Sequence, residues 1–414
     1  MPRLLSIATV LAAIAIAAPS HAASRPHHPA SAHKVAERNT RGAVPYAGNE
    51  EAMRWADDMA RRRGLDAAWV RRSVAQARFL PVVARLMQPA PAGTPKNWRV
   101  YRSRFIDPVR IAAGVRFWQD NRDALQRAQQ RYGVPPEIIV GIVGVETIYG
   151  QQMGTFRVID ALATLAFSFP DSHPRAAERA AYFRGELEQF LALQARREAD
   201  PLEPVGSYAG AMGMPQFMPS SFARWAVDFD GDGRIDLARS AADVIGSVAN
   251  YFQSYGWQPG MPAYYPVTFD PARLDKDALL APDILPTFSV ASFTARGAVL
   301  EGAALQHQGP LALVELQNGD APPQYVAGTE NFYVVTRYNW SSYYAMAVIE
   351  LGQAVKDAVE ARASARGPAP APADAPAVAP LDADAAAPPV APTPTPPAAP
   401  ADAAPPVDSS AAPD

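Results

Sequence analysis

The residue with the clearest chemical potential in this chain is Glu146, a carboxylate in an otherwise apolar run. Residues 138–145, which precede it, are all Ile, Val or Gly. A helix that is apolar on every side is buried, and burial raises the pKa of a carboxyl group because it disfavours the charged form. A Glu that stays protonated near neutral pH can act as a general acid. The structural alternative is a buried ion pair with a basic residue such as Arg157.

Two glycine-rich segments follow Glu146 and are candidates for shaping a site around it. Residues 150–154 come directly after the apolar run, so Glu146 is expected near the C-terminal end of its helix, where the helix dipole also disfavours a negative charge. Residues 206–220 combine small residues with Ser207, Tyr208 and Gln216. Small residues allow a ligand to approach the backbone, and the three neutral polar groups suit sugar hydroxyls and amides. The alternative for this segment is an ordinary turn region.

Length and composition limit the classes of protein. The chain has 414 residues, a net charge of −3 and no cysteine. The small net charge argues against nucleic-acid binding, and the lack of cysteine excludes disulfides and a lipid-modified cysteine. Residues 1–22 resemble a cleavable signal peptide, with Arg3, an apolar stretch and Ser20-His21-Ala22 at its end. We therefore expect an exported, periplasmic protein without a transmembrane segment in its mature form.

The ends of the chain differ in composition from its middle. Residues 23–45 are polar and aperiodic and predict a flexible N-terminal segment. Residues 367–414 are mostly Ala, Pro and Asp, with hardly any large apolar side chains, and predict a disordered tail. The folded region is expected at 46–366.

The folded region is expected to be α+β and mainly α. Apolar periodicity predicts helices at 50–63, 66–76, 108–132, 176–197, 243–255 and 343–363, and Pro135-Pro136 marks the start of the helix that carries Glu146. Short β-rich runs at 264–269, 287–293, 311–316 and 331–338 predict a small sheet, inserted at about 263–340.

Several separate motifs together resemble one family. They are Gly-Val-Glu-Thr-x-x-Gly at 144–150, Asp-Ala-Leu-Ala-Thr-Leu at 160–165, Gly-Ser-Tyr-Ala-Gly-Ala-Met-Gly-x-x-Gln-Phe-Met-Pro-Ser at 206–220, and the blocks at 331–339 and 343–348. In this order and spacing they are similar to the lytic murein transglycosylases of the B type. The resemblance covers about residues 48–360.

The resemblance implies a fold and a reaction. The fold is a lysozyme-like core with a helical domain and a small β domain. The reaction is a carbon–oxygen lyase reaction on peptidoglycan, in which the β-1,4 bond between N-acetylmuramic acid and N-acetylglucosamine is cleaved without water to leave 1,6-anhydro ends. The general acid and base of the family falls on Glu146. Asp160 is the nearest rival acid, and a helix cap is the other interpretation of it.

The resemblance also assigns substrate-binding positions. They are Tyr101, Ser207, Tyr208, Gln216, Tyr338, Asn339 and Tyr344. Tyrosines present a flat apolar ring and one hydroxyl to a sugar. The alternative for Tyr343-Tyr344 is a core aromatic pair.

Residues 228–236 carry a second chemical motif. Asp228, Asp230 and Asp232 occupy positions 1, 3 and 5 of an EF-hand-like loop, Gly233 occupies position 6, and the main-chain carbonyl of Arg234 follows. Position 12 is Arg239 instead of Glu. The resemblance implies a divergent loop with a later Asp, and Asp243 is the candidate for that last ligand. The motif predicts a structural Ca²⁺ with no part in the chemistry. A solvated acidic turn is the alternative.

Two other functions remain open at this point. A muramidase would hydrolyse the same bond but normally needs a second carboxylate, and none is evident. A non-catalytic peptidoglycan-binding protein has no reason to bury an unpaired acid. The expected partner is the glycan strand of peptidoglycan, and the candidate protein partners are those of cell-wall synthesis and division.

Overall fold

The structure is a computed structural model that describes residues 29–40, 42–88 and 96–365. The predicted signal peptide and tail lie outside the described residues. The first part of the chain is helical. Its elements are α1 (Pro29–Thr40), a 3-10 turn (Tyr46–Gly48), α2 (Glu50–Arg63), α3 (Ala67–Gln76), α4 (Pro81–Leu86), α5 (Trp98–Ser103), α6 (Pro108–Asp120), α7 (Arg122–Tyr132), α8 (Pro136–Thr147), α9 (Val158–Phe167), α10 (Ala176–Arg196), α11 (Pro219–Trp225) and α12 (Ala241–Ser254).

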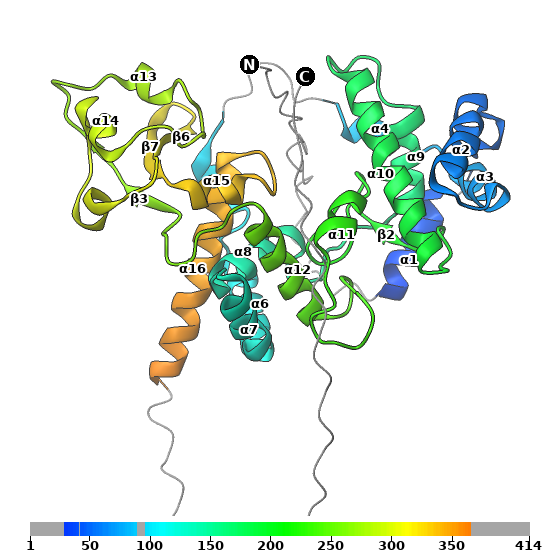
Figure 1. The fold of residues 1–414 in the computed structure, drawn as a ribbon, viewed down its shortest axis with the longest axis horizontal. Helices are drawn as coiled ribbons and strands as arrows, with labels where there is room; N and C mark the ends of the chain where they lie inside the picture. The colour runs from blue at the N-terminus through cyan, green and yellow to red at the C-terminus, as the bar shows by residue number, and fades with distance from the viewer. Residues whose placement is uncertain (1–28, 41, 89–95, 366–414) are drawn as a thin grey trace, which may run out of the picture. The chain divides into compact units, whose positions relative to one another are not determined.

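Short strands and helices follow, and two helices end the described region. They are β3 (Tyr264–Pro266), β4 (Thr268–Phe269), α13 (Lys276–Leu280), α14 (Val290–Ala295), β5 (Ala298–Val299), a 3-10 turn (Gly302–Gln306), β6 (Ala312–Asn318), β7 (Ala321–Gly328), α15 (Glu330–Thr336) and α16 (Ser342–Ala365). Strands β3, β7 and β6 form an antiparallel sheet in that order, and β4 pairs with β5. In Figure 1 this sheet and helices α13 and α14 lie together. A two-residue ladder, β1 (Phe156–Arg157) with β2 (Val205–Gly206), lies within the helical part.

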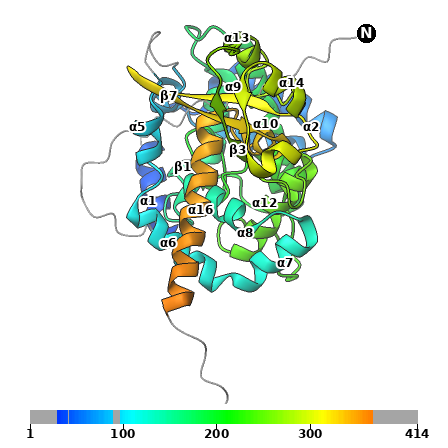
Figure 2. The same ribbon diagram turned by 90° about the vertical axis from the view of Figure 1, so that its left-hand side faces the viewer.

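The described residues form two apolar cores. The larger core joins side chains of α2–α12 to those of α15 and α16, and α8 contributes most of its length to it. The smaller core lies in the β region and includes Leu279, Phe293 and Leu311. Figure 2 shows α16 beside α6 and α8, which also pack against each other. The helix with Glu146 is therefore held by neighbours from both halves of the chain.

Local sequence signals account for the points at which several helices begin and end. Pro136 occupies the first turn of α8 after Pro135, where a missing N–H costs no hydrogen bond. Helix α2 begins at Asn49, whose side chain accepts a hydrogen bond from Ala52 N, and ends at Gly64 in the left-handed conformation. The predicted helices at 50–63, 66–76, 176–197, 243–255 and 343–363 match α2, α3, α10, α12 and α16 within a few residues.

Two runs that were predicted as strands are helices. Residues 287–293 contain the start of α14, where Ser289 Oγ accepts a hydrogen bond from Ser292 N. Residues 331–338 contain most of α15, where Thr329 Oγ1 accepts from Asn331 N. In both cases a capping side chain satisfies the free N–H groups of a short helix, and this outweighs the β-propensity of the apolar residues.

Two further predictions differ from the structure, and one strand was not predicted. The long helix predicted at 108–132 is divided at Asn121 into α6 and α7. The segment 23–45, predicted to be flexible, contains helix α1, where Ala36 is buried and Asn39 Nδ2 donates to Thr155 O over 3.2 Å. Strand β7 was not predicted, because Pro322 and Pro323 argue against a strand.

Candidate active site

Glu146 lies in the last turn of α8, where the chain leaves the helix abruptly. Ile148 and Tyr149 both adopt the left-handed backbone conformation, with φ of 51° and 56°, and Gly150 follows at 86°. Non-glycine residues adopt this conformation at a cost in energy. The strained exit directs the chain away from Glu146, and the C-terminal end of the helix disfavours a negative charge there.

Two glycines allow α8 and α16 to pack in very close contact. A Cβ atom on Gly141 would lie 2.2 Å from Val348 O, and a Cβ atom on Gly352 would lie 2.0 Å from Glu137 O. Gly352 contacts the start of α8, whereas Val348, which comes earlier in α16, contacts the middle of α8. The two helices therefore run antiparallel. The N-terminal end of α16 therefore reaches the C-terminal end of α8, and Tyr344 lies beside Glu146.

The Glu146 carboxyl has a hydrogen bond but no ion pair among the described residues. Tyr344 Oη donates to Glu146 Oε1 over 2.5 Å. Burial raises the pKa of Glu146 to about 7, although the hydrogen bond from Tyr344 lowers it. The residue as a whole is only half-buried. Its carboxyl is thus enclosed by protein while one side stays accessible, so the group can hold a proton at neutral pH and deliver it to a ligand.

The alternative ion pair with Arg157 is wrong. Arg157 Nε lies 2.6 Å from Asp160 Oδ2, and Asp160 Oδ1 also accepts a hydrogen bond from Arg78 N over 2.9 Å. Asp160 is therefore a buried acid that joins the end of α3 to α9. The helix-cap interpretation of Asp160 is also wrong, because the N-cap position of α9 is Arg157 and no side chain caps it.

Three tyrosines from separate elements surround the carboxyl. The ring of Tyr338 stacks on that of Tyr344 with centroids 6.3 Å apart and an interplanar angle of 12°. Tyr338 Oη donates to Pro215 O over 2.5 Å. Burial raises the pKa of Tyr101 and that of Tyr338, and the negative charge of Glu146 raises both further. Tyr101 on α5, Tyr338 after α15 and Tyr344 on α16 thus share one electrostatic environment with Glu146.

The adjacent pair Tyr343-Tyr344 has two different environments. Tyr343 Oη accepts a hydrogen bond from Gln317 N over 2.7 Å, and its ring meets Trp98 edge to face. Tyr343 therefore belongs to the core, as the structural alternative predicted, and it joins α16 to β6. Tyr344 is more deeply buried and points its hydroxyl at Glu146.

The segment 206–220 is tied to the end of α8. Thr147 is fully buried, and its Oγ1 donates to Met214 O over 2.8 Å and accepts from Gly150 N over 3.0 Å. Gln216 has a φ of 50°, and its Nε2 donates to Gly213 O over 2.9 Å and to Met153 O over 3.3 Å. These contacts connect both glycine-rich segments, as their positions after Glu146 indicated.

The remaining sequence-predicted polar residues are half-buried. Ser207 Oγ accepts hydrogen bonds from Ala209 N and Ala211 N. Among the described residues, none binds the Ser207 hydroxyl proton or Oε1 of Gln216, so both groups remain for a ligand. Burial raises the pKa of Tyr208. Asn339 lies in the turn between α15 and α16, next to Tyr338.

The fully buried acids in the described part of the chain all have their own partners. Asp160 binds Arg157, Glu186 accepts from Ser220 N and Ser220 Oγ, and Asp243 accepts from two main-chain N–H groups. None of these buried acids is therefore free to act beside Glu146.

Three aspartates lie together at the EF-hand-like loop. Carboxylate oxygens of Asp228, Asp230 and Asp232 are within 4.8 Å of one another. Gly231 and Gly233 have φ of 80° and 86°, and Gly233 N donates to Asp228 Oδ2. Three carboxylates so close repel one another, and an all-oxygen set of this kind is what Ca²⁺ prefers. The residues present fit this cation.

Asp243 contacts the backbone of the loop in this structure, and its role as the last ligand stays a prediction. It is buried on α12, its Oδ1 accepts from Phe229 N and its Oδ2 accepts from Asp236 N, both over 2.8 Å. It lies outside the group of three, because both of its oxygens are turned toward the loop backbone. Asp243 thus holds the loop against α12. The contacts of the main-chain carbonyl of Arg234 do not decide whether it is a metal ligand.

Sequence reasoning missed the residues that set the geometry of Glu146. Gly141, Gly352 and Thr147 determine how α8 meets α16 and the segment 206–220. The small-residue spacing of Gly141 and Gly144 in an apolar helix was the available signal, since such spacing allows close helix packing. Their partners on α16 lie some 200 residues further along the chain and could not be identified without the fold.

Comparison with known proteins supports the same class of enzyme. The family model described as the transglycosylase SLT domain matches residues 48–353. The membrane-bound lytic murein transglycosylase B of Escherichia coli K12 is 43% identical over 326 residues, which are 75% of this chain and 84% of that protein.

Two solved structures add to this result. The E. coli lytic transglycosylase SLT35, solved in complex with calcium, has a TM-score of 0.66 and 41% identity, and the match covers 81% of this chain and 99% of that one. Pseudomonas aeruginosa SltB3, solved with NAG-anhNAM-pentapeptide, has a TM-score of 0.61 and 28% identity, and the match covers 74% of this chain and 79% of that one.

The fold and the family match define a transglycosylase with a lysozyme-like core, a helical domain and a small β domain. The chain belongs to the SLT-domain lytic transglycosylase family, so the resemblance seen in the motifs is confirmed. It is an enzyme of peptidoglycan cleavage, and this function is favoured over those of a muramidase and a binding protein. In the described part of the chain, no helix is both long and apolar enough to cross a membrane.

Proposed function

We propose that Glu146 performs both proton transfers of a non-hydrolytic cleavage of the MurNAc-β-1,4-GlcNAc bond. The protonated carboxyl donates its proton to the glycosidic oxygen while the bond from that oxygen to the muramoyl anomeric carbon breaks. The resulting carboxylate then removes the proton of the muramoyl 6-hydroxyl, whose oxygen bonds to the anomeric carbon. The products are a free GlcNAc 4-hydroxyl and a 1,6-anhydro-muramoyl end, and Glu146 is protonated again.

One observation supports this role most strongly. Glu146 is an enclosed carboxyl with a pKa of about 7, and its hydrogen-bond partner is a neutral hydroxyl. A pKa near the working pH allows one group to give a proton and take one back within a cycle. The oxocarbenium-like centre would be stabilised by the acetamido carbonyl of the substrate itself, since the site offers no second carboxylate for that purpose.

The muramidase alternative requires a second free carboxylate, and none of the fully buried acids among the described residues supplies one. An inverting hydrolase has a second carboxylate that activates water, and a retaining one has a carboxylate nucleophile. Asp160, Glu186 and Asp243 are engaged elsewhere. Digestion of sacculi in water enriched in heavy oxygen distinguishes the reactions. We expect anhydro-muropeptides without the label, whereas a labelled reducing end would identify hydrolysis.

Substrate binding is proposed for the residues around the carboxyl. Tyr101 and Tyr338 present rings to the sugar, Ser207 and Gln216 supply their unused hydroxyl proton and carbonyl oxygen, and Tyr344 orients Glu146. Tyr208 and Asn339 are assigned to the rim of the same site. The complex of P. aeruginosa SltB3 with a muropeptide supports this substrate class. Replacing Ser207 by Ala should raise KM more than it lowers kcat, because Ser207 contacts no reacting atom.

A structural Ca²⁺ is proposed for the loop at 228–236. Asp228, Asp230 and Asp232 would hold the ion, and the main-chain carbonyl of Arg234 is a further candidate ligand. The calcium complex of E. coli SLT35 supports this assignment. The ion would neutralise the three carboxylates. Phe229 within the loop packs against Tyr132 and Gly246, so the loop anchors α7 and α12 to each other.

The location and the chain ends are also part of the proposal. Residues 1–22 would be removed as a signal peptide on export to the periplasm, and residues 46–366 would form the catalytic region. N-terminal sequencing of the protein from the periplasmic fraction would begin at Ala23 if this assignment is correct. A chain that keeps Met1 would contradict it.

A further inference from the structure

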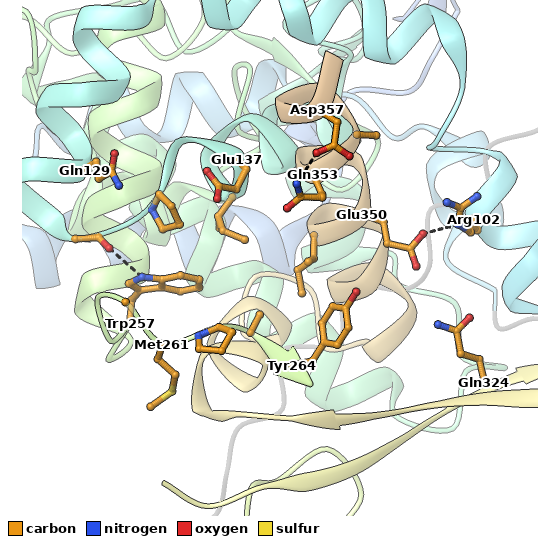
Figure 3. A pocket seen from close by; sticks show the side chains of 18 residues that line it. Arg102, Gln129, Glu137, Trp257, Met261, Tyr264, Gln324, Glu350, Gln353 and Asp357 are labelled. Atoms are coloured by element: carbon orange, nitrogen blue, oxygen red, sulfur yellow. Dashed lines mark hydrogen bonds and ion pairs between the residues drawn. The ribbon is translucent and has the colours of Figure 1, made fainter. Parts of the chain in front are cut away.

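A cavity of about 1040 Å³ lies at the end of α8 and α16 that is remote from Glu146. Its wall is built from α5, α7, α8, α16, β7 and the segment 257–264. In Figure 3, Gln129 and Trp257 lie on one side, Arg102 and Gln324 on the other, and Gln353 between them. Six segments that are distant in sequence thus enclose one space, which the helix packing described above holds in shape.

The cavity is separate from the catalytic centre. Glu146 does not line it. Glu137, which does, precedes Glu146 by nine residues on α8, which corresponds to about 13 Å along the helix and about half a turn around it. Gln353 follows Tyr344 by the same number of residues on α16. The two helices therefore present one site at each end, on different faces.

Each charged side chain of the cavity already has a partner. Arg102 Nε binds Glu350 Oε2, and Lys356 Nζ, adjacent to the cavity, lies 3.0 Å from Glu137 Oε1. Asp357 Oδ1 accepts from Gln353 Nε2 over 2.7 Å. A free anion would meet three carboxylates, and a metal ion would have to separate existing pairs. The electrostatics therefore favour an uncharged ligand.

Neutral polar groups and an apolar floor remain for that ligand. Gln129 and Gln324 are exposed, and their amides have no hydrogen bond to any described residue. The floor includes Ile138 and Ile349, and the half-buried ring of Tyr264 adds a flat face. Amides that donate and accept, together with a flat apolar surface, suit the hydroxyl and acetamido groups of a sugar.

We propose that this cavity is a second carbohydrate site, which binds an uncharged N-acetylated oligosaccharide separately from the catalytic centre. Its volume is at the upper end of the range for small-molecule sites, so it has space for more than one sugar ring. The proposal rests on the proposed function only in that the sugars would be the N-acetylglucosamine units of the same polymer, which carry no lactyl carboxylate.

The test uses chitotetraose, an uncharged oligomer of N-acetylglucosamine, and the full-length chain with Glu146→Gln to prevent turnover. Isothermal titration should show two equivalents of ligand per chain. Adding Gln129→Ala and Gln324→Ala should weaken one of the two sites by about tenfold and leave the other unchanged. Both glutamines are exposed, so folding is not at risk. Gln353→Trp, which places a bulky ring in the middle of the cavity, should weaken that site further.

Gln253→Ala provides the matched control, because Gln253 is an exposed glutamine on α12 and lies outside the cavity. Chitotetraose binding that is unchanged by the paired glutamine substitutions would overturn the proposal, whatever the number of equivalents. Two equivalents that persist unchanged in the Gln353→Trp chain would also overturn it. Turnover is not a readout here, so a failure of the Glu146 assignment would appear in the digestion experiments and not in this titration.

Discussion

Tyr344 and Glu146 are 198 positions apart in the chain and are joined by a hydrogen bond of 2.5 Å between the tyrosine hydroxyl and Oε1 of the carboxyl. The bond exists because α16 runs antiparallel to α8 at a distance that only glycines at 141 and 352 allow. It opposes the effect of burial on the pKa of Glu146. The proton affinity of the proposed acid is thus set by the packing of two helices.

Removing this hydroxyl should change the pH dependence of catalysis. In the Tyr344→Phe variant the pKa of Glu146 should rise above about 7, because the hydrogen bond that lowers it is lost. Bond cleavage needs protonated Glu146, so the alkaline limb of kcat/KM should move to higher pH. We also expect activity to fall by about tenfold, since a hydrogen bond to the charged form is missing. Tyr343→Phe is the control, because that hydroxyl binds Gln317. An unshifted limb in Tyr344→Phe would contradict the role assigned to the bond.

The raised pKa of Glu146 should also make stability depend on pH. The folded chain holds this proton up to pH of about 7, while the unfolded chain releases it near the ordinary value of 4.5. The native state therefore binds more protons between these values, and the free energy of unfolding should fall as pH rises through them, by up to about 3 kcal/mol.

Glu146→Gln should remove most of this dependence, so the variant should be more stable than the wild type at pH 8. Urea unfolding at pH 5 and pH 8 measures the effect. Glu360→Gln, at an exposed position of α16, is the matched control. If the free energy of unfolding depends equally on pH in the wild type and in Glu146→Gln, burial does not raise the pKa of Glu146.

Gly141→Ala tests the helix contact itself. The new methyl group would meet Val348 O at 2.2 Å, and a main-chain atom cannot move without shifting α16. We expect a loss of about 1–3 kcal/mol in stability and a larger loss of activity than of folded protein, because Tyr344 moves away from Glu146. Gly185→Ala on α10 has open space around the new Cβ and should stabilise the chain by about 0.5–1 kcal/mol. Normal activity in folded Gly141→Ala would show that the close packing is unnecessary.

Calcium should act on stability and not on chemistry. At a free concentration about a hundredfold above its dissociation constant, the ion should raise the free energy of unfolding by about 3 kcal/mol. A chelator should reverse the gain without preventing cleavage at low temperature. Asp232→Asn should lose the response, while Asp277→Asn on the surface of α13 should keep it. A calcium response in Asp232→Asn equal to that of the wild type would contradict the proposed ligands.

The sequence predicted the parts of the site that depend on local signals. Pro136 marked the start of α8, the apolar run indicated that the Glu146 carboxyl is enclosed, and the alternating aspartates at 228–232 indicated a cluster of carboxylates. It failed where a cap outweighs composition, as at Ser289 and Thr329, because those short helices are rich in β-branched and aromatic residues.

The sequence also could not supply partners that the fold brings together. The separate environments of Tyr343 and Tyr344 follow from the direction in which α16 passes α8. The two oxygens of Asp243 were equally suited to a metal and to backbone N–H groups, and only the position of α12 assigns them to the backbone. Residue type indicated which interactions each side chain can make. Packing in the fold decided which of these interactions it makes.

The central claim is tested most directly by digesting purified sacculi with the wild type and with Glu146→Gln, followed by mass spectrometry of the released muropeptides. We predict 1,6-anhydro-muramoyl products from the wild type and a rate lower by at least about a hundredfold for the variant. The amide keeps the shape of the side chain but can neither give nor take the proton. Anhydro products released by folded Glu146→Gln at the wild-type rate would contradict the account.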